Sequence, residues 1–276
     1  MNHRINTLYF SATGTTEKIV NGIAQRIAEN TGGLANIKKH DFTLPGGRKE
    51  AVTFTREDLV IIGVPVYAGR VPNVLVKYLH TINGSGALVV AVVVFGNRDY
   101  DDALLELNDI LESDGFTVIA AGAFVGEHSF SRVLGANRPD AKDMILVNRF
   151  ADQVYQKLSM QITFERIQVK GNRPYRKYYA PKDENGEPVR DFRLISPETG
   201  DDCIECKTCA EVCPMGSIDY DDVTRITGIC IKCCACIKKC PTQAKHFTDP
   251  RFLRHQYELE EAYGCRNEPE WFVQEK

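Results

Sequence analysis

The chain has 276 residues, which suggests about two domains, and its composition (43% hydrophobic, 26% charged) is that of an ordinary globular protein. A formal net charge of −3 argues against a protein built for nucleic acid or an anionic membrane surface. The opening residues MNHRINTLYFSATG lack the apolar stretch of a signal peptide, and no run approaches the roughly 18 apolar residues of a membrane helix. We therefore expect a cytoplasmic protein without a membrane anchor.

Strand-like and helix-like segments alternate over residues 1–160. The runs DLVIIGVPV and ALVVAVVVF are continuously apolar, as is typical of parallel strands that are covered on both faces. This alternation predicts an α/β fold with an open, doubly wound parallel sheet. The expected strands are 5–10, 34–39 (the weakest), 58–66, 87–95 and 117–125, and the expected helices are 15–30, 72–81, 101–113 and 139–159.

A hydroxyl-rich loop, SATGTT, joins the first expected strand to the first helix. Free N–H groups at a helix N-terminus bind anions, and hydroxyl groups add further donors. The loop contains no lysine and one glycine, so it is neither a Walker P-loop nor the dinucleotide fingerprint. It resembles the phosphate loop of flavodoxins, whereas a well-capped helix is the alternative interpretation. The residues predicted to contact the FMN phosphate are Ser11, Thr13, Gly14, Thr15 and Thr16.

Two further loops, VPVYAGRVP and FGNRDYDD, follow the third and fourth strands, at the sheet edge where such folds bind ligands. Tyr67 and Tyr100 could offer aromatic faces to an isoalloxazine ring, although a loop tyrosine can equally be local packing. Gly69 and Gly96 would let backbone donors approach the pyrimidine edge of that ring. The residues predicted to contact FMN here are Pro65, Val66, Tyr67, Ala68, Gly69, Phe95, Gly96, Asn97, Arg98, Tyr100 and Asp101.

Three other segments carry weaker signals. GEHSFS (126–131) faces the same edge, but we expect His128 to be a structural histidine and assign it no role. Residues 161–196 combine turn residues, prolines and aromatic residues, which predicts a partly stiff, packed arm. The arginines and tyrosines of this arm could suggest RNA contact, but we favour packing and expect no nucleic-acid partner. The tail, 249–276, is expected to hold a short helix and to dock through Trp271 and Phe272.

Two cysteine runs, CIECKTCAEVCP (203–214) and CIKCCACIKKCP (230–241), repeat one pattern at an offset of 27 residues. Each reads C-x2-C-x2-C-x3-C-P. In this pattern three cysteines bind one [4Fe–4S] cluster, and the fourth, before proline, binds the other. The predicted ligand sets are Cys203, Cys206, Cys209 and Cys240 for one cluster, and Cys230, Cys233, Cys236 and Cys213 for the other.

Structural zinc is the alternative interpretation of these runs. Nine of the ten cysteines lie between residues 203 and 240, and in a reducing compartment this density indicates metal rather than disulfides. A zinc site needs four ligands, usually from two C-x2-C pairs, so it does not explain three evenly spaced thiols plus C-P, twice. We therefore favour two clusters. Cys234 is expected to be a buried small apolar residue and Cys265 a free thiol.

Residues 203–241 resemble a bacterial-type two-cluster ferredoxin, and the whole chain resembles the flavodoxin–ferredoxin fusion proteins called ferrodoxins. The resemblance implies a short-chain flavodoxin-like FMN domain at 1–160 and a ferredoxin-like α+β iron–sulfur domain at 197–248. It is absent from the arm at 161–196 and from the tail.

The function that this resemblance implies is electron transfer between FMN and two [4Fe–4S] clusters, and onward to soluble redox proteins or oxidoreductases. FMN holds one or two electrons, whereas each cluster handles one at a time. We expect an electron carrier rather than an enzyme with its own substrate. Two alternatives stay open: an FMN-dependent reductase of a small quinone-like acceptor that is fed through the clusters, and a metal-stabilised interaction module.

Overall fold

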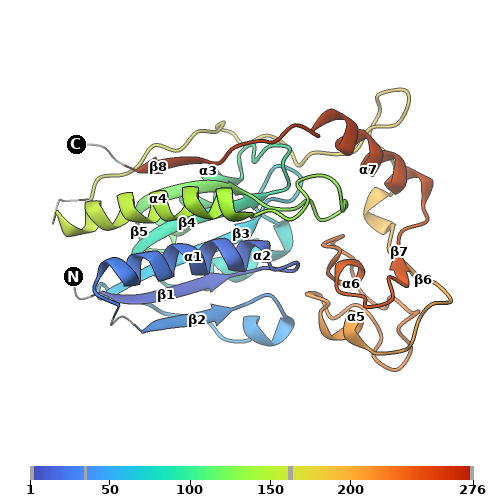
Figure 1. Cartoon of the computed structure of the whole chain (residues 1–276), viewed down its shortest axis with the longest axis horizontal. Coiled ribbons are helices and arrows are strands. Elements are labelled where there is room, and N and C mark those ends of the chain that lie inside the picture. Colours follow the sequence, from blue (N-terminus) through green and yellow to red (C-terminus); the bar gives the residue numbers. More distant parts are fainter. Residues whose placement is uncertain (1–2, 34–35, 161–163, 274–276) are drawn as a thin grey trace.

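The apolar segments predicted as strands form one parallel sheet. The structure is a computed structural model that describes residues 3–33, 36–160 and 164–273. The strands are β1 (Arg4–Tyr9), β2 (Ile37–Asp41), β3 (Asp58–Pro65), β4 (Leu88–Phe95) and β5 (Thr117–Val125) (Figure 1). Their spatial order is β2-β1-β3-β4-β5, and every neighbouring pair among them is parallel. This is the flavodoxin-like doubly wound order, which confirms the predicted fold class.

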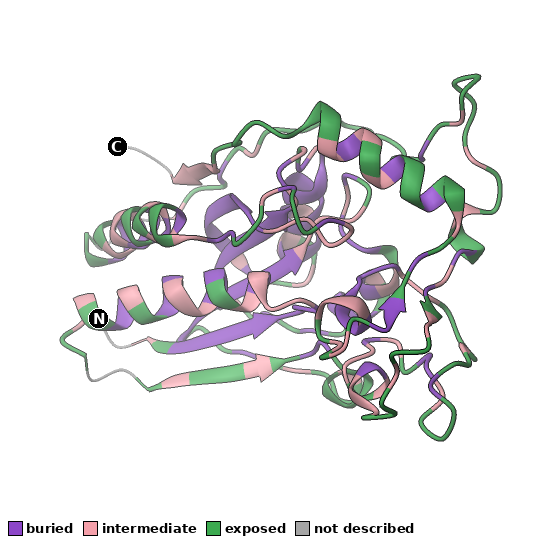
Figure 2. Ribbon diagram, turned by 45° about the vertical axis from the view of Figure 1, so that its right-hand side comes forward, coloured by how far each residue is buried: buried purple, intermediate pink, exposed green. Residues whose placement is uncertain are grey.

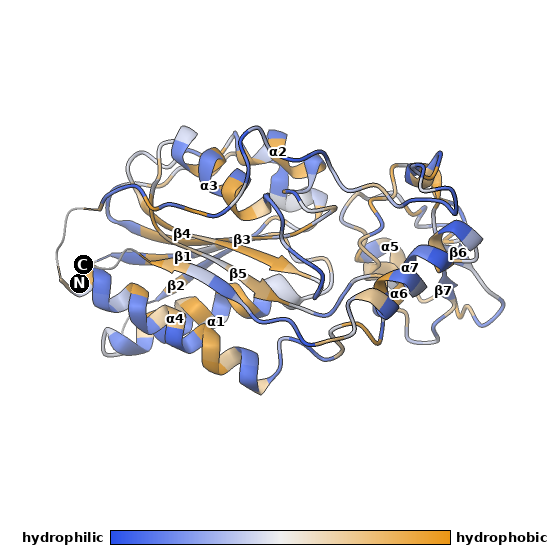
Figure 3. Cartoon of the chain, turned by 90° about the horizontal axis from the view of Figure 1, so that it is seen from above, coloured by the Kyte–Doolittle hydropathy of each residue, from blue (hydrophilic) through white to orange (hydrophobic). Residues whose placement is uncertain are grey.

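Four helices cover the two faces of the sheet. α1 (Thr15–Asn30) and α4 (Ala141–Ser159) lie on one face, and α2 (Asn73–Leu79) and α3 (Ala103–Ser113) lie on the other (Figure 3). Alternate residues of the central strands β3 and β4 enter the two cores, because successive side chains of a strand point to opposite faces. The strands are therefore buried along almost their whole length (Figure 2).

The predicted boundaries of these elements hold to within a few residues. β2 is described from Ile37, and Leu34 and Ala35, at the start of the predicted strand, lie outside the described residues. α3 begins at Ala103 rather than at Asp101, because Asp101 has a φ of 45° and so departs from helical geometry. β5 runs through nine residues without an insertion, in agreement with the short-chain form.

The cysteine-rich segment forms a small α+β unit at the carboxyl end of the sheet (Figures 1 and 3). It contains the antiparallel pair β6 (Glu198–Thr199) and β7 (Lys245–His246) and the short helices α5 (Thr208–Glu211) and α6 (Ala235–Lys238). The remaining helices are the 3-10 turns η1 (Pro45–Arg48) and η2 (Phe192–Leu194), and α7 (Pro250–Ala262) in the tail. In the described parts of the chain, no helix is long and apolar enough to cross a membrane.

The arm packs along the first domain rather than crossing solvent as a free coil. Asp102, at the start of α3, accepts hydrogen bonds from the backbone N–H groups of Asn172 (2.9 Å) and Arg176 (2.7 Å). Burial would raise the pKa of Asp102, but these donors bring it below its ordinary value. Further along, the N–H of Tyr179 donates to the carbonyl of Ala68 (2.9 Å). The arm therefore reaches the loop after β3 in a defined register.

The tail returns to the first domain and adds a sixth strand to its sheet. β8 (Glu270–Val273) pairs antiparallel with β5. The ring of Trp271 stacks on Phe124 at 6.4 Å, and its Nε1 donates to Gln153 Oε1 at 2.7 Å. Residues 1–160 therefore share their sheet with the last described strand of the chain, which the sequence did not predict.

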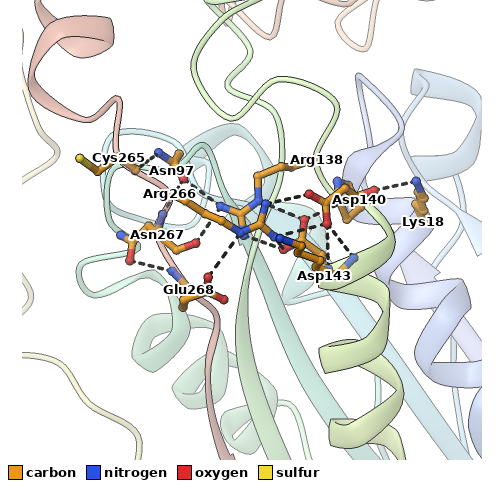
Figure 4. A network of polar contacts seen from close by, with 11 residues as sticks. Lys18, Asn97, Arg138, Asp140, Asp143, Cys265, Arg266, Asn267 and Glu268 are labelled. Carbon is orange, nitrogen blue, oxygen red and sulfur yellow. Dashed lines mark hydrogen bonds and ion pairs between the residues drawn. The ribbon is translucent and has the colours of Figure 1, made fainter.

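A polar network holds the segment before β8 against the first domain (Figure 4). Arg138 and Asp143 form an ion pair at 2.6 Å, with side chains only 3% and 4% exposed. Arg266, from the tail, binds the same carboxylate at 2.7 Å. Asn97 accepts from Arg138 (2.9 Å) and donates to the carbonyls of Tyr263 (2.7 Å) and Cys265 (2.8 Å). The loop after β4 and the tail are thus held by one buried charge pair.

This network predicts a large effect of Asp143→Asn. The variant leaves the buried Arg138 without its carboxylate partner, whereas Arg266 keeps Asp140 and Glu268. Removing one partner of a buried ion pair costs about 3–5 kcal/mol. Urea unfolding followed by the emission of Trp271, the single tryptophan, should show the loss. Glu258→Gln is the matched control, because its pair with Arg254 is 42% exposed on both sides and should contribute less than about 1 kcal/mol. Equal midpoints for the two variants would contradict the assigned role.

Candidate functional site

Two cavities in the cysteine-rich unit are each lined by cysteines from both runs. We call Cys203, Cys206, Cys209 and Cys240 the outer set; they line a cavity of about 10 Å³. We call Cys213, Cys230, Cys233 and Cys236 the inner set; they line a cavity of about 30 Å³, together with Cys234. Each set combines three cysteines of one run with the fourth cysteine of the other. These are the combinations that the spacing predicts for cluster ligands.

The backbone of the two runs repeats as well as the sequence. Residues with positive φ recur at the same offset of 27: Glu205 and Lys232 (52° and 55°), and Lys207 and Cys234 (64° and 58°). Left-handed residues between helical ones turn successive N–H groups toward one concave side, an arrangement that binds anions such as iron–sulfur clusters. Cys234 therefore occupies the place of Lys207, at the start of its short helix, rather than that of a ligand.

The two sets differ in exposure and in thiol acidity. Burial raises the pKa of Cys233 to about 12 and also raises the pKa of Cys230 and Cys236. Cys206 is exposed, and a hydrogen bond with Thr208 lowers the pKa of its thiol. The buried inner thiolates therefore need a nearby positive charge, such as iron.

Across the described ranges, no three His, Cys, Asp or Glu side chains form a group that could hold a metal ion.

Two adjoining cavities lie at the carboxyl ends of the strands. We call the smaller one, of about 50 Å³, the hydroxyl cavity, because Thr13, Thr15 and Thr16 line it. We call the larger one, of about 230 Å³, the aromatic cavity; Tyr67, Phe130, Tyr179, Phe192 and His255 are among its lining residues. Val66, Tyr67, Gly96, His128 and Ser129 line both cavities. A small polar end that continues into an aromatic one fits a phosphate joined to a planar ring.

The start of α1 supplies the hydroxyl cavity with unoccupied donors. Gly14 precedes the helix with a φ of 91° and, as a glycine, has no side chain that could cap the first N–H groups. Ser11 binds one N–H group of the first turn: its Oγ accepts from the N–H of Glu17 (2.9 Å), and its own N–H donates to Thr43 (2.8 Å). Ser11 therefore shapes the loop, while the helix N-terminus can receive an anion.

The loop after β3 lies between the aromatic cavity and the inner set. Tyr67 and Arg70 exchange two backbone hydrogen bonds, around a turn with positive φ at Ala68 (53°) and Gly69 (76°). The positive φ of Gly69 favours glycine, and a Cβ there would lie 2.3 Å from a carboxylate oxygen of Asp101, which would have to move. Burial is the main cause that raises the pKa of Tyr67 well above its usual value, and nearby thiols of the second cysteine run contribute. Tyr67 and Cys233 of the inner set both line the hydroxyl cavity, so Tyr67 lies next to that set.

Some predicted FMN contacts lie elsewhere. Tyr100 is 6% exposed, packs on Phe95 at 5.8 Å and donates to Glu270, so its ring belongs to the core and does not face these cavities. Asn97 holds the tail, and Asp101 pairs with Arg98 and Arg176. The predicted residues that do line the cavities are Thr13, Thr15, Thr16, Pro65, Val66, Tyr67, Ala68, Gly69, Phe95, Gly96 and Arg98, whereas Ser11, Gly14, Asn97, Tyr100 and Asp101 do not.

The sequence did not assign His128 to the site, although its segment was expected at this edge. Its Nδ1 accepts the N–H of Phe130 at 3.1 Å, so the ring proton is on Nε2. Burial, Lys238 and other nearby cations lower the pKa of His128 to about 3, so the ring is neutral. Tyr179 in the arm and His255 in α7 were not predicted, because no motif in either segment indicates contact with a ligand.

Direct contacts hold the cysteine-rich unit against this edge of the sheet. The Lys238 ammonium, between two cysteines of the second run, is 13% exposed and pairs with Glu127. It also donates to the carbonyls of His128 (2.8 Å) and Ser131 (2.6 Å). On the other side, Arg48 donates to the carbonyl of Pro214. Cys233 of the inner set lines the hydroxyl cavity itself.

Comparisons with known proteins agree with these two parts. Residues 144–258 match the family model of the 4Fe-4S dicluster domain, which begins within α4 and ends within α7. No curated protein matches the chain significantly. The chain therefore combines a flavodoxin-like fold, defined by its strand order, with a 4Fe-4S dicluster domain. The 4Fe-4S dicluster domain supports a redox role in electron transfer.

Three solved structures that are similar to the first domain illustrate the comparison. A flavodoxin from Archaea is 14% identical, with a TM-score of 0.40, and the match covers 56% of this chain and 99% of that one. The Fusobacterium nucleatum flavodoxin bound to flavin mononucleotide is 16% identical, with a TM-score of 0.37 and coverages of 58% and 99%. Rubredoxin oxygen:oxidoreductase from Desulfovibrio gigas is 16% identical, with a TM-score of 0.40 and coverages of 57% and 36%.

The cysteine sets predict the effect of single substitutions on cluster content. Anaerobically prepared protein should hold about eight iron and eight sulfide per chain, as two cubic clusters require. Cys240→Ala should lose mainly the outer cluster and Cys213→Ala mainly the inner one, whereas Cys234→Ala should lose neither. Iron and sulfide assays with low-temperature EPR of the reduced protein measure this. About one zinc per chain and no sulfide would overturn the assignment.

The hydroxyl cavity predicts that the phosphate of FMN contributes strongly to binding. Riboflavin, which lacks the phosphate, should bind far more weakly, because the α1 N-terminus would lose its anion. Thr13→Val and Thr16→Val should each weaken FMN by about 1–3 kcal/mol if their hydroxyls bond the charged group. Fluorescence titration measures the affinities. Thr31→Val, at the opposite end of α1, is the control, and similar affinities for FMN and riboflavin would rule out this phosphate site.

Proposed function

We propose that the chain carries electrons between FMN, bound in the hydroxyl and aromatic cavities, and two [4Fe–4S] clusters bound by the inner and outer sets. The observation that carries this proposal is that Cys233 of the inner set lines the hydroxyl cavity. Cofactors in these sites would be neighbours within one chain. FMN supplies the ability to exchange one or two electrons, and the protein supplies position and electrostatics.

The proposed order of the carriers is FMN, inner cluster, outer cluster. Tyr67 lines the aromatic cavity, and it lines the hydroxyl cavity together with Cys233 of the inner set. Cys206 of the outer set is exposed, and Ile204 beside it is 63% exposed. The outer cluster is therefore the proposed point of exchange with soluble redox proteins or oxidoreductases.

The residues of this chain would orient the cofactors and exclude water. The hydroxyls of Thr13 and Thr16 and the α1 N-terminus would bind the phosphate, and the turn at Ala68 and Gly69 would bring backbone donors close to the ring. The neutral His128 offers one N–H donor, at Nε2, to a group in the cavities. Lys245, which is 2% exposed, brings positive charge near both sets, and this charge opposes the rise in the pKa of Cys209 and Cys236 that burial causes.

The test is whether the electrons pass within one molecule. After rapid reduction of the clusters in the intact protein, the flavin absorbance should change at a rate that is independent of protein concentration. Lys238→Met should slow this step, because the ammonium holds the inner set against the sheet edge, whereas exposed Lys239→Met should not. A rate that falls in proportion to dilution would show transfer between molecules, and the proposed internal path would be wrong.

A further inference from the structure

His255 in α7 has a buried ring nitrogen without a partner. The residue is 6% exposed, and no donor or acceptor in the described part of the chain reaches its Nδ1. An orphaned buried polar atom costs about 1–3 kcal/mol, so it requires an explanation. Two other buried side-chain atoms share this condition, Nε2 of His40 and Oδ1 of Asn108. Of the three residues, only His255 lines the aromatic cavity.

Aromatic neighbours fix the position of the His255 ring but give it no hydrogen bond. Tyr179 stacks on it at 5.7 Å with an interplanar angle of 26°. Phe192 and Phe130 meet it edge-on, at 5.7 Å and 6.2 Å. A phenylalanine would satisfy all of these contacts without the cost of a polar atom. Nδ1 itself has almost no accessible surface, so the ring can present a nitrogen to a group in the cavity only through Nε2. The imidazole at this position is better explained by such a hydrogen bond than by packing.

The cavity is suited to a planar heteroaromatic ring. Tyr67 and Phe130 from the first domain, Tyr179 from the arm and Phe192 at the arm's end give it aromatic walls. Burial lowers the pKa of His255, so the ring is neutral and offers one donor and one acceptor. The isoalloxazine ring of FMN carries both kinds of group along its edge.

We propose that His255 is a flavin-binding residue that the C-terminal helix supplies to the first domain, and that its imidazole forms a hydrogen bond with the isoalloxazine ring of FMN. This inference rests on the proposed FMN site and adds to it a residue from outside the flavodoxin-like part. The flavin site is then assembled from three stretches of chain, the loops of residues 1–160, the arm and α7. The chain binds its flavin fully only when all three are in place.

Two substitutions separate this role from packing. His255→Phe keeps the ring contacts and removes the nitrogens, and His255→Gln keeps a donor and an acceptor. Titration of flavin-free full-length protein with FMN should show about tenfold weaker binding for His255→Phe, which corresponds to about 1.4 kcal/mol, and a smaller loss for His255→Gln. The melting temperature of the flavin-free His255→Phe protein should not fall, because the orphaned atom has been removed. His40→Phe, at the other orphaned imidazole, should leave FMN affinity unchanged.

Each other outcome decides against the proposal. Unchanged FMN affinity in His255→Phe would show that the nitrogen meets no flavin atom. A melting temperature that falls in the flavin-free variant, or loss of iron and sulfide from both variants, would show that the ring is structural. If the wild-type protein itself binds no FMN, the proposed function fails first and this inference with it. Tight wild-type binding with unaltered variants overturns the inference alone.

Discussion

The Lys238 ammonium and its three oxygen acceptors hold together the two halves of this molecule. The lysine belongs to the second cysteine run, and its acceptors, on Glu127, His128 and Ser131, belong to the loop after β5. A cation buried at a domain boundary is stable only if oxygen atoms are placed to receive it, so the contact specifies one orientation of the cysteine-rich unit. That orientation brings Cys233 to the hydroxyl cavity and Tyr67 to the inner set.

Much of this arrangement could be predicted from local patterns. The apolar runs at 58–66 and 87–95 indicate buried parallel strands, and the cysteine spacing indicates which four thiols share a cavity. SATGTT and VPVYAG follow strands, so their place at one edge of the sheet follows from topology. Tyr100 shows the limit of this reasoning. A tyrosine three residues before a helix can turn toward a ligand or into the core, and the hydrogen bond with Glu270, 170 residues away, selects the core.

The last strand and the cavity residues of the arm and α7 depend on contacts between segments that are distant in the sequence. No local periodicity indicates such contacts. β8 is four residues long and pairs with β5 across the whole cysteine-rich unit. Tyr179 reaches the aromatic cavity from the arm, which has no regular pattern, and His255 reaches it from α7, an ordinary amphipathic helix. Cys234, by contrast, could be interpreted from the sequence, because its spacing excludes it as a cluster ligand. The positive φ that it shares with Lys207 explains its position before the short helix.

The pairing of β8 with β5 makes the cysteine-rich unit an insertion within the first domain rather than an appendage at its end. Both of its connections, the arm and the segment after α7, are held on that domain. The unit therefore resembles a long loop whose two ends are already in place. The conformational entropy that is lost in bringing those ends together is lost when the sheet forms. Iron and sulfide would then be incorporated into a chain confined near its final position, beside the sheet edge. Loss of the metal would loosen this loop without releasing it.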